Sequence, residues 1–201
     1  TPVANVASVA TSEDQDVVIS LSGSDIDGDA LTFSLDTDAV NGSVVVDGSF
    51  ATYTPNTNFN GDDSFSFTVS DGSLSDTAEV TVSVSAVNDA PVLATVSDIF
   101  FDEDGSGSTS LSASDVDGDD LTYSITGGDQ ITASLSGSDV SFSAPADYNG
   151  SETFTVSVAD GELTDSQSIT VTVNAVNDAP VATTGLSGTT AEDQSVVVSL
   201  S

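Results

Sequence analysis

Val87-Asn88-Asp89-Ala90-Pro91 returns later in the chain as Val176-Asn177-Asp178-Ala179-Pro180, 89 positions further on. Asp25-Ile26-Asp27-Gly28-Asp29 returns in the same way as Asp115-Val116-Asp117-Gly118-Asp119, after 90 positions. A period of this length is too long for one coil of a solenoid, but it suits a complete β-sandwich domain of about 100 residues. The sequence therefore predicts domains in tandem, joined by the Asn-Asp-Ala-Pro stretch.

A third copy of the repeat begins near the end of the sequence. Glu192-Asp193 matches Glu13-Asp14, and Val196–Ser201 matches Val17–Ser22. We expect a first repeat over residues 1–88, a second over residues 89–177, and the first strands of an incomplete third repeat over residues 178–201. The sequence then corresponds to a window from a longer array, in which residues 182–201 fray or pair with a neighbouring chain.

Apolar residues alternate with serine and threonine through much of the chain. One such run is Phe65-Ser66-Phe67-Thr68-Val69, and its counterpart in the second repeat is Phe154-Thr155-Val156-Ser157-Val158. Turn-forming pairs such as Asn41-Gly42 and Asp71-Gly72 separate these runs. Alternation with a period of two indicates strands with one buried face. We therefore predict an all-β fold of two tandem sandwiches with about seven strands each.

The charge of the chain is entirely negative on its side chains. There are 33 acidic residues and no Lys, Arg or His, which gives a net charge of −33. Two carboxylates about 4 Å apart repel each other by roughly 4 kcal/mol at an effective dielectric constant of about 20. Clustered Asp residues are therefore costly unless a metal ion lies between them. Two plainer explanations stay open: acidic surfaces maintain solubility, and Asp-Gly pairs form simple turns.

Composition also excludes several classes of partner. Without basic side chains the chain has nothing to neutralise the phosphates of a nucleic acid or an anionic membrane surface. It has no apolar run of about 20 residues, so we expect no membrane insertion. It shows no signal peptide, which would lie upstream if one exists. Cysteine is absent, so disulfides cannot stabilise the domains.

The stretch between the repeats combines stiffness with oxygen donors. Pro91 restricts the residue before it to an extended conformation, so the join is short and stiff. Asn88 and Asp89 carry hard oxygen atoms, and calcium takes about six to eight such ligands at roughly 2.3–2.6 Å. The sequence therefore predicts that oxygen ligands meet at the end of each repeat.

These motifs, recurring together in a fixed order, resemble the cadherin-like tandem repeats of very large bacterial surface adhesins. The resemblance covers both full repeats and the partial one, and it implies Ig-like, cadherin-like sandwiches with Ca²⁺ at each junction. The ligands that it implies for the first junction are Glu13, Asp63, Asn88, Asp89, Asp115, Asp117 and Asp160. Those for the second junction are Glu103, Glu152, Asn177 and Asp178. Those facing a repeat upstream are Asp25, Asp27 and Asp71. The linker lacks a second Asn and one residue of the animal pattern, which leaves the number of ions per junction open.

The resemblance implies an extender of a secreted, cell-surface adhesin, stiffened by calcium, which projects a distal binding domain and contributes to cell adhesion. Its partners would be calcium and the adjoining repeats of the same polypeptide. The alternative is a self-assembling extracellular filament or surface-layer subunit, in which identical chains are partners too. We expect no enzymatic activity. His, Cys, Lys and Arg are absent, and only paired carboxylates could act, as they do in glycoside hydrolysis.

Overall fold

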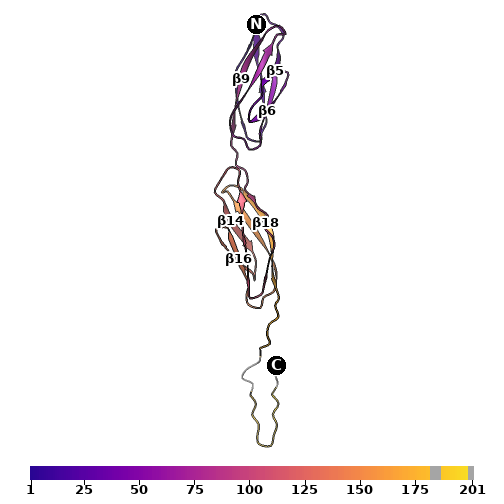
Figure 1. Cartoon of the computed structure of the whole chain (residues 1–201), viewed down its shortest axis with the longest axis vertical. Coiled ribbons are helices and arrows are strands. Elements are labelled where there is room, and N and C mark those ends of the chain that lie inside the picture. The colour runs from indigo at the N-terminus through magenta and orange to yellow at the C-terminus, as the bar shows by residue number, and fades with distance from the viewer. Residues whose placement is uncertain (182–186, 199–201) are drawn as a thin grey trace. The chain divides into compact units, whose positions relative to one another are not determined.

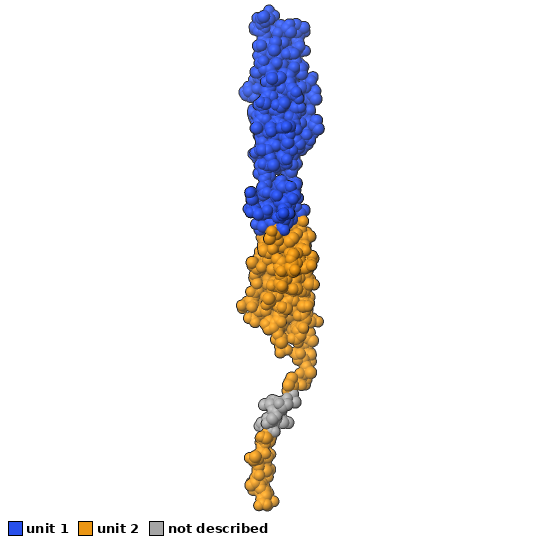
Figure 2. All heavy atoms as spheres, turned by 90° about the vertical axis from the view of Figure 1, so that its left-hand side faces the viewer, with its two compact units in different colours: residues 1–92, 114–121, 159–164 blue, residues 93–113, 122–158, 165–201 orange. Residues whose placement is uncertain are grey.

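The computed structural model describes residues 1–181 and 187–198, and within them all regular structure is β-strand (Figure 1). These residues form two compact units, drawn in different colours in Figure 2. Unit 1 holds Thr1–Val92 together with Ser114–Leu121 and Ala159–Thr164, and unit 2 holds Leu93–Ala113, Thr122–Val158 and the chain from Asp165. Two loops of the second repeat therefore belong to the same compact unit as the whole first repeat.

The first repeat is a sandwich of a four-stranded and a three-stranded sheet. Its strands are β1 (Pro2–Ala4), β2 (Ala7–Ser12), β3 (Val17–Ser20), β4 (Gly23–Asp25), β5 (Thr32–Thr37), β6 (Gly42–Asp47), β7 (Phe50–Pro55), β8 (Gly61–Ser70) and β9 (Ser75–Ser85). The sheets run in the order β2-β9-β8-β5 and β3-β7-β6, and β1 pairs with β4. Strand β2 lies parallel to β9, whereas β8 is antiparallel to both β9 and β5.

The second repeat has the same plan. Its strands are β10 (Val92–Leu93), β11 (Ile99–Asp102), β12 (Ser106–Ser110), β13 (Ala113–Ser114), β14 (Thr122–Gly127), β15 (Thr132–Ser136), β16 (Asp139–Ser143), β17 (Gly150–Ala159) and β18 (Thr164–Asn174). The sheets run β11-β18-β17-β14 and β12-β16-β15, with β10 paired to β13. Strand β11 is parallel to β18, as β2 is to β9. The predicted all-β tandem sandwich is confirmed.

The alternating runs supply the cores. Phe65, Phe67 and Val69 of β8 are at most 2% exposed, and the serine and threonine residues between them lie on the other face of the sheet. In the second repeat Phe142 and Phe154 meet edge to face, with their ring centroids 5.3 Å apart. Burying one such ring contributes about 1.5–3 kcal/mol. Each sandwich therefore has its own hydrophobic core, which holds the loops at its two ends in place.

A Glu-Asp turn is built into every copy of the repeat. Asp14, Asp104 and Asp193 have φ values of 57°, 62° and 61°, a left-handed conformation that Asp tolerates better than most residues. In the third copy the Thr190 hydroxyl donates to the Gln194 carbonyl over 3.0 Å, as Thr11 does to Gln15.

The described parts of the third copy, residues 178–181 and 187–198, carry no strand. The rest of the segment expected to fray or pair, residues 182–186 and 199–201, lies outside the described residues. Among the described residues no helix has the length and apolar character needed to cross a membrane.

Candidate metal centre

The linker between the repeats meets two acidic loops of the second repeat inside unit 1. The Asn88 side-chain amide donates to Asp160 Oδ2 over 3.0 Å. The backbone N–H of Asp89 donates to Asp117 Oδ2 over 2.8 Å. The structure thus brings together Asn88, Asp89, Asp117 and Asp160, which lie up to 72 positions apart in the sequence.

The Asp-x-Asp-Gly-Asp loop folds around its first carboxylate. Asp115 Oδ1 accepts hydrogen bonds from the backbone N–H groups of Asp117, Gly118 and Asp119 over 3.0–3.3 Å. Gly118 has φ 82°, which a residue with a side chain adopts only with strain. The loop gathers oxygens from Asp115, Asp117 and Asp119 within 4.8 Å of one another. A single turn therefore presents three carboxylates to one point.

Three oxygens in unit 1 are buried without any hydrogen bond, and two of them belong to the junction: Asp89 Oδ2 and Asp115 Oδ2. The third is Asp25 Oδ2. Asp89 and Asp115 both line a cavity of about 450 Å³. Burying an unpaired carboxylate oxygen is expensive unless a cation compensates it. Burial, followed by the charges of Asp117, Asp14, Glu13 and Asp115, raises the pKa of Asp89. The donor set is made of hard oxygens, which suits calcium.

Glu13 anchors the linker from the first repeat. Its side chain is among the most buried charged groups of the described chain, at 3% exposure. One carboxylate oxygen accepts the backbone N–H of Val87 over 2.5 Å. Asp160 is anchored as well, because amide donors from Leu163, Asn88 and Glu162 hold the pKa of its carboxyl below the ordinary value. The acidic groups are thus fixed in place by backbone contacts.

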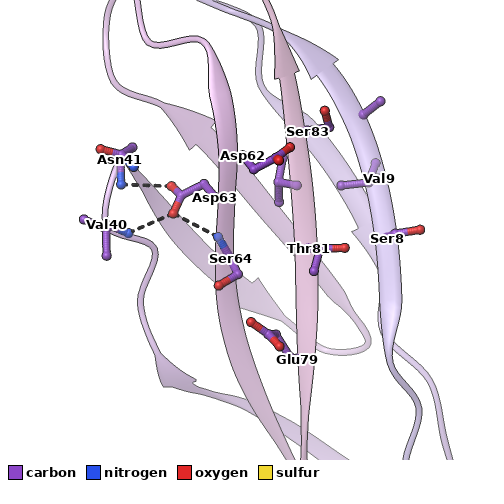
Figure 3. A pocket seen from close by; sticks show the side chains of 12 residues that line it. Ser8, Val9, Val40, Asn41, Asp62, Asp63, Ser64, Glu79, Thr81 and Ser83 are labelled. Carbon is purple, nitrogen blue, oxygen red and sulfur yellow. Dashed lines mark hydrogen bonds between the residues drawn. The ribbon is translucent and has the colours of Figure 1, made fainter.

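Asp63, which the resemblance assigned to this junction, is engaged elsewhere. Its carboxylate accepts the backbone N–H groups of Val40, Asn41 and Ser64 over 2.9–3.2 Å (Figure 3). The Tyr53 hydroxyl donates to it over 3.0 Å, and together with burial this carboxylate raises the pKa of Tyr53. Both oxygens of Asp63 therefore hold a loop of its own repeat.

Glu152 occupies the matching place in the second repeat. It accepts the backbone N–H groups of Asp129, Gln130 and Ile131 over 2.7–3.0 Å, and the Tyr148 hydroxyl donates to it over 3.3 Å. The structure brings neither Asp63 nor Glu152 into hydrogen-bonding contact with the linker that follows its repeat.

The two phenols come from different positions. Tyr53 corresponds to Phe142 in the second repeat, and Tyr148 corresponds to Phe59 in the first, each 89 positions apart. Each repeat thus has one phenol at one of two alternative positions, paired with Asp63 in the first repeat and with the longer Glu152 in the second. We call this phenol–carboxylate pair the clasp.

A larger hollow of about 900 Å³ lies on the outer face of the β2-β9-β8 sheet, beside Asp63 (Figure 3). Its walls include Ser8, Asp62, Glu79 and Thr81. Among the described residues it contains no buried oxygen that lacks a hydrogen-bond partner. It therefore lacks the feature that distinguishes the smaller cavity at Asp89 and Asp115.

Two of the predicted upstream ligands, Asp25 and Asp27, also meet. Asp25, Asp27 and Asp29 place oxygens within 4.8 Å of one another. The N-terminal ammonium of Thr1 lies 3.1 Å from Asp25 Oδ2 and 3.7 Å from Asp27 Oδ2, and its hydrogen bond lowers the pKa of Asp25. Asp71 repeats the role of Asp160, because its Oδ1 accepts two amide donors from its own turn over 2.7 Å.

At the far end of the second repeat, Glu103 again anchors the following segment by accepting the Val176 N–H over 2.5 Å. Asp104, Asp147 and Asp178 place oxygens within 4.8 Å of one another. The charge of Asp147, followed by burial and by the charges of Glu103 and Asp104, raises the pKa of Asp178. Asn177, also predicted here, donates from its side chain to the Asp178 carbonyl over 3.1 Å.

Sequence reasoning missed six residues of these clusters: Asp14, Asp29, Asn58, Asp104, Asp119 and Asp147. Asp14 and Asp104 belong to the repeated Glu-Asp turn, so the repeat itself could have identified them. Asn58 and Asp147 each precede an Asn-Gly turn by two residues. Only the folded chain shows that Asn58 lines a cavity with Asp89 and that Asp147 places an oxygen near one of Asp178.

The family model of the bacterial Ig domain matches the chain twice, over residues 1–83 and 88–172. The chain belongs to this family. No curated protein matches this bacterial Ig chain. Among solved structures it resembles Drosophila N-cadherin EC1-4 at 17% identity, with a TM-score of 0.55, over 88% of this chain and 49% of that one. It resembles human protocadherin-24 EC1-2 at 16% identity, with the same TM-score, over 88% of this chain and 99% of that one.

The expected cadherin-like, Ig-like tandem repeat is therefore confirmed at the level of the fold. An endo-fucoidan hydrolase from glycoside hydrolase family 107 also matches, at 24% identity with a TM-score of 0.38. The bacterial Ig chain spans 29% of that protein's length, and the alignment covers 88% of the bacterial Ig chain.

Proposed function

We propose that these bacterial Ig repeats are a calcium-stiffened extender of a secreted, cell-surface adhesin, which projects a distal binding domain. The observation that carries the proposal is a pair of buried, unpartnered oxygens, Asp89 Oδ2 and Asp115 Oδ2, on two residues that line one cavity. One oxygen comes from the linker and the other from a loop of the second repeat. A cation shared by the two would join the linker to that loop.

Each residue that would hold calcium at this junction carries an oxygen donor and is held in a fixed position. They are Glu13, Asp14, Asn88, Asp89, Asp115, Asp117 and Asp160. Without calcium the carboxylates repel one another, since the chain has no Lys or Arg to offset them. With calcium the same groups attract one ion, so the join becomes stiff. The proposed role is mechanical and involves no catalysis.

The experiment compares the whole chain in calcium chloride, in magnesium chloride and in EGTA. We expect calcium near a hundredfold excess over its Kd to raise the thermal midpoint by about 10 °C, and to narrow the spread of dimensions seen by X-ray scattering. Magnesium should act less, because it demands octahedral geometry and keeps its waters. Equal midpoints and scattering curves in all three buffers would refute the proposal.

Two controls sharpen this test. Asp47→Asn removes one exposed carboxylate from β6 that does not line the cavity at Asp89, and should leave the calcium response intact. Measuring mass across protein concentration separates the extender from the alternative, a self-assembling filament or surface-layer subunit. A mass that stays monomeric in calcium supports the extender, whereas growth with concentration supports assembly.

A further inference from the structure

A loop that contains Asn58 in the first repeat and Asp147 in the second has a similar backbone conformation in both repeats but a different charge. In the first repeat the Asn58 N–H donates to Asp14 Oδ1 over 3.1 Å, and in the second the Asp147 N–H donates to Asp104 Oδ1 over 3.3 Å. Asn58 and Asp147 have φ values of 57° and 58°. The same loop therefore presents a neutral amide in one repeat and a carboxylate in the other.

Asn58 lines the same cavity as Asp89 and Asp115. Its neighbours there include Asp89 and Asp115, whose Oδ2 atoms are buried without hydrogen-bond partners. Its counterpart Asp147 contributes an oxygen to a three-carboxylate group with Asp104 and Asp178. An amide oxygen remains a hard donor for a divalent cation, but it brings no negative charge.

We propose that Asn58 tunes the calcium affinity of the first junction, holding it below the affinity that an aspartate at this position would give. The inference rests on the proposed calcium role. Calcium affinity in proteins rises with the number of charged ligands at a site of fixed geometry. Because Asp147 shows that the loop accepts a carboxylate without changing its backbone, the charge alone distinguishes the two positions. Junctions in one chain then stiffen at different calcium concentrations.

The test uses the whole chain and the variant Asn58→Asp. Calcium is titrated while the backbone amides of Asp89 and Ala90 are followed by NMR, so that this junction is measured by itself. We expect the Kd of the variant to be about tenfold lower than that of the wild type. The thermal midpoint of the variant in EGTA should fall below that of the wild type, since the added carboxylate repels those of Asp14 and Asp89.

Asn56→Asp is the matched control. It adds the same charge to the same loop on an exposed side chain that does not line the cavity, and its Kd should stay within about twofold of the wild type. If Asn56→Asp lowers the Kd as much as Asn58→Asp does, general electrostatic attraction explains the effect and the inference fails. An unchanged Kd in Asn58→Asp overturns it as well.

A second variant covers the case in which Asn58→Asp does not fold. Asn58→Gly accommodates the positive φ and removes the amide oxygen, and its Kd should rise severalfold. An unchanged Kd in that variant would also overturn the inference. If the wild type itself binds no calcium at these amides, the proposed function fails, an outcome distinct from failure of the Asn58 assignment.

Discussion

The side-chain amide of Asn88 donates a hydrogen bond of 3.0 Å to Asp160 Oδ2, linking the segment between the repeats to a turn of the second repeat. The acceptor turn is itself tied down, because Asp160 Oδ1 accepts the N–H groups of Glu162 and Leu163 over 2.6 and 2.7 Å. One carboxylate therefore closes a tight turn with one oxygen and reaches the linker with the other.

Replacing Asp160 with Asn should weaken both roles. The variant loses a charged acceptor, so we expect it to be less stable than the wild type in calcium, as measured by chemical denaturation. Its calcium-induced rise in thermal midpoint should shrink to less than half. Asp47→Asn serves again as the control. A full calcium response in Asp160→Asn would show that Asp160 is no ligand.

The effect of Asp115→Asn on the free energy of unfolding should have opposite signs with and without calcium. Its Oδ1 still accepts the amide donors of its loop, whereas the buried Oδ2 becomes a neutral amide nitrogen. In EGTA the variant loses carboxylate repulsion, so its free energy of unfolding should exceed that of the wild type by about 1 kcal/mol. In calcium the order should reverse. Denaturation curves of both proteins in the two buffers test this prediction. If the same protein is the more stable one in both buffers, Asp115 has no metal role.

Removing the phenolic hydroxyl of the clasp should destabilise each repeat without changing its calcium affinity. Tyr53 is fully buried and its bond to Asp63 is 3.0 Å, whereas the bond from the less buried Tyr148 to Glu152 is 3.3 Å. We expect Tyr53→Phe to cost about 1–3 kcal/mol and Tyr148→Phe less, as measured by urea unfolding. The calcium Kd at the Asp89 amide should be unchanged. A shifted Kd in Tyr53→Phe would place Asp63 in the calcium site after all.

Glu152 should contribute a pH-dependent part of the stability. Burial by itself raises its pKa, but amide donors from Gln130, Asp129 and Ile131 and the Tyr148 hydroxyl hold the folded pKa below the ordinary value of 4.5. A depressed folded pKa stabilises the protein above pH 4.5, and this contribution is lost as the pH falls through the folded value.

Glu152→Gln should therefore be less stable than the wild type at pH 7, and the difference should shrink below pH 4.5. The measurement is denaturation at several pH values in EGTA. Glu79→Gln, on the exposed face of β9, is the control. A difference that stays constant across this range would contradict the assignment.

Much of the fold could be predicted because its signals are local. The alternation around Phe67 and Val156 defines strands with one buried face, and the repeated motif at Asn88 marks where one sandwich ends. The grouping of Asn88, Asp89, Asp115, Asp117 and Asp160 was also accessible, since repetition at fixed spacing assigns equivalent places to equivalent residues.

The remaining ligand assignments depended on contacts between distant parts of the chain. The carboxylate of Asp63 is only three residues into β8, yet its donors at Val40 and Asn41 lie 23 and 22 positions earlier. Asn58 reaches Asp14 across 44 positions. No spacing rule distinguishes a carboxylate that closes a loop from one that faces a cation. The difference depends on which backbone amides are left without a partner once the sheets have formed.

The clasp also limits where recombination between the DNA segments encoding the two repeats can occur. A crossover at equivalent points between positions 53 and 59 would create one hybrid with phenylalanine at both positions and another with tyrosine at both. The first hybrid has no phenolic hydroxyl for its carboxylate, and the second gains an extra polar group to accommodate. Recombination that expands or shortens an array of such repeats should therefore yield viable products more often when its breakpoints avoid this short interval.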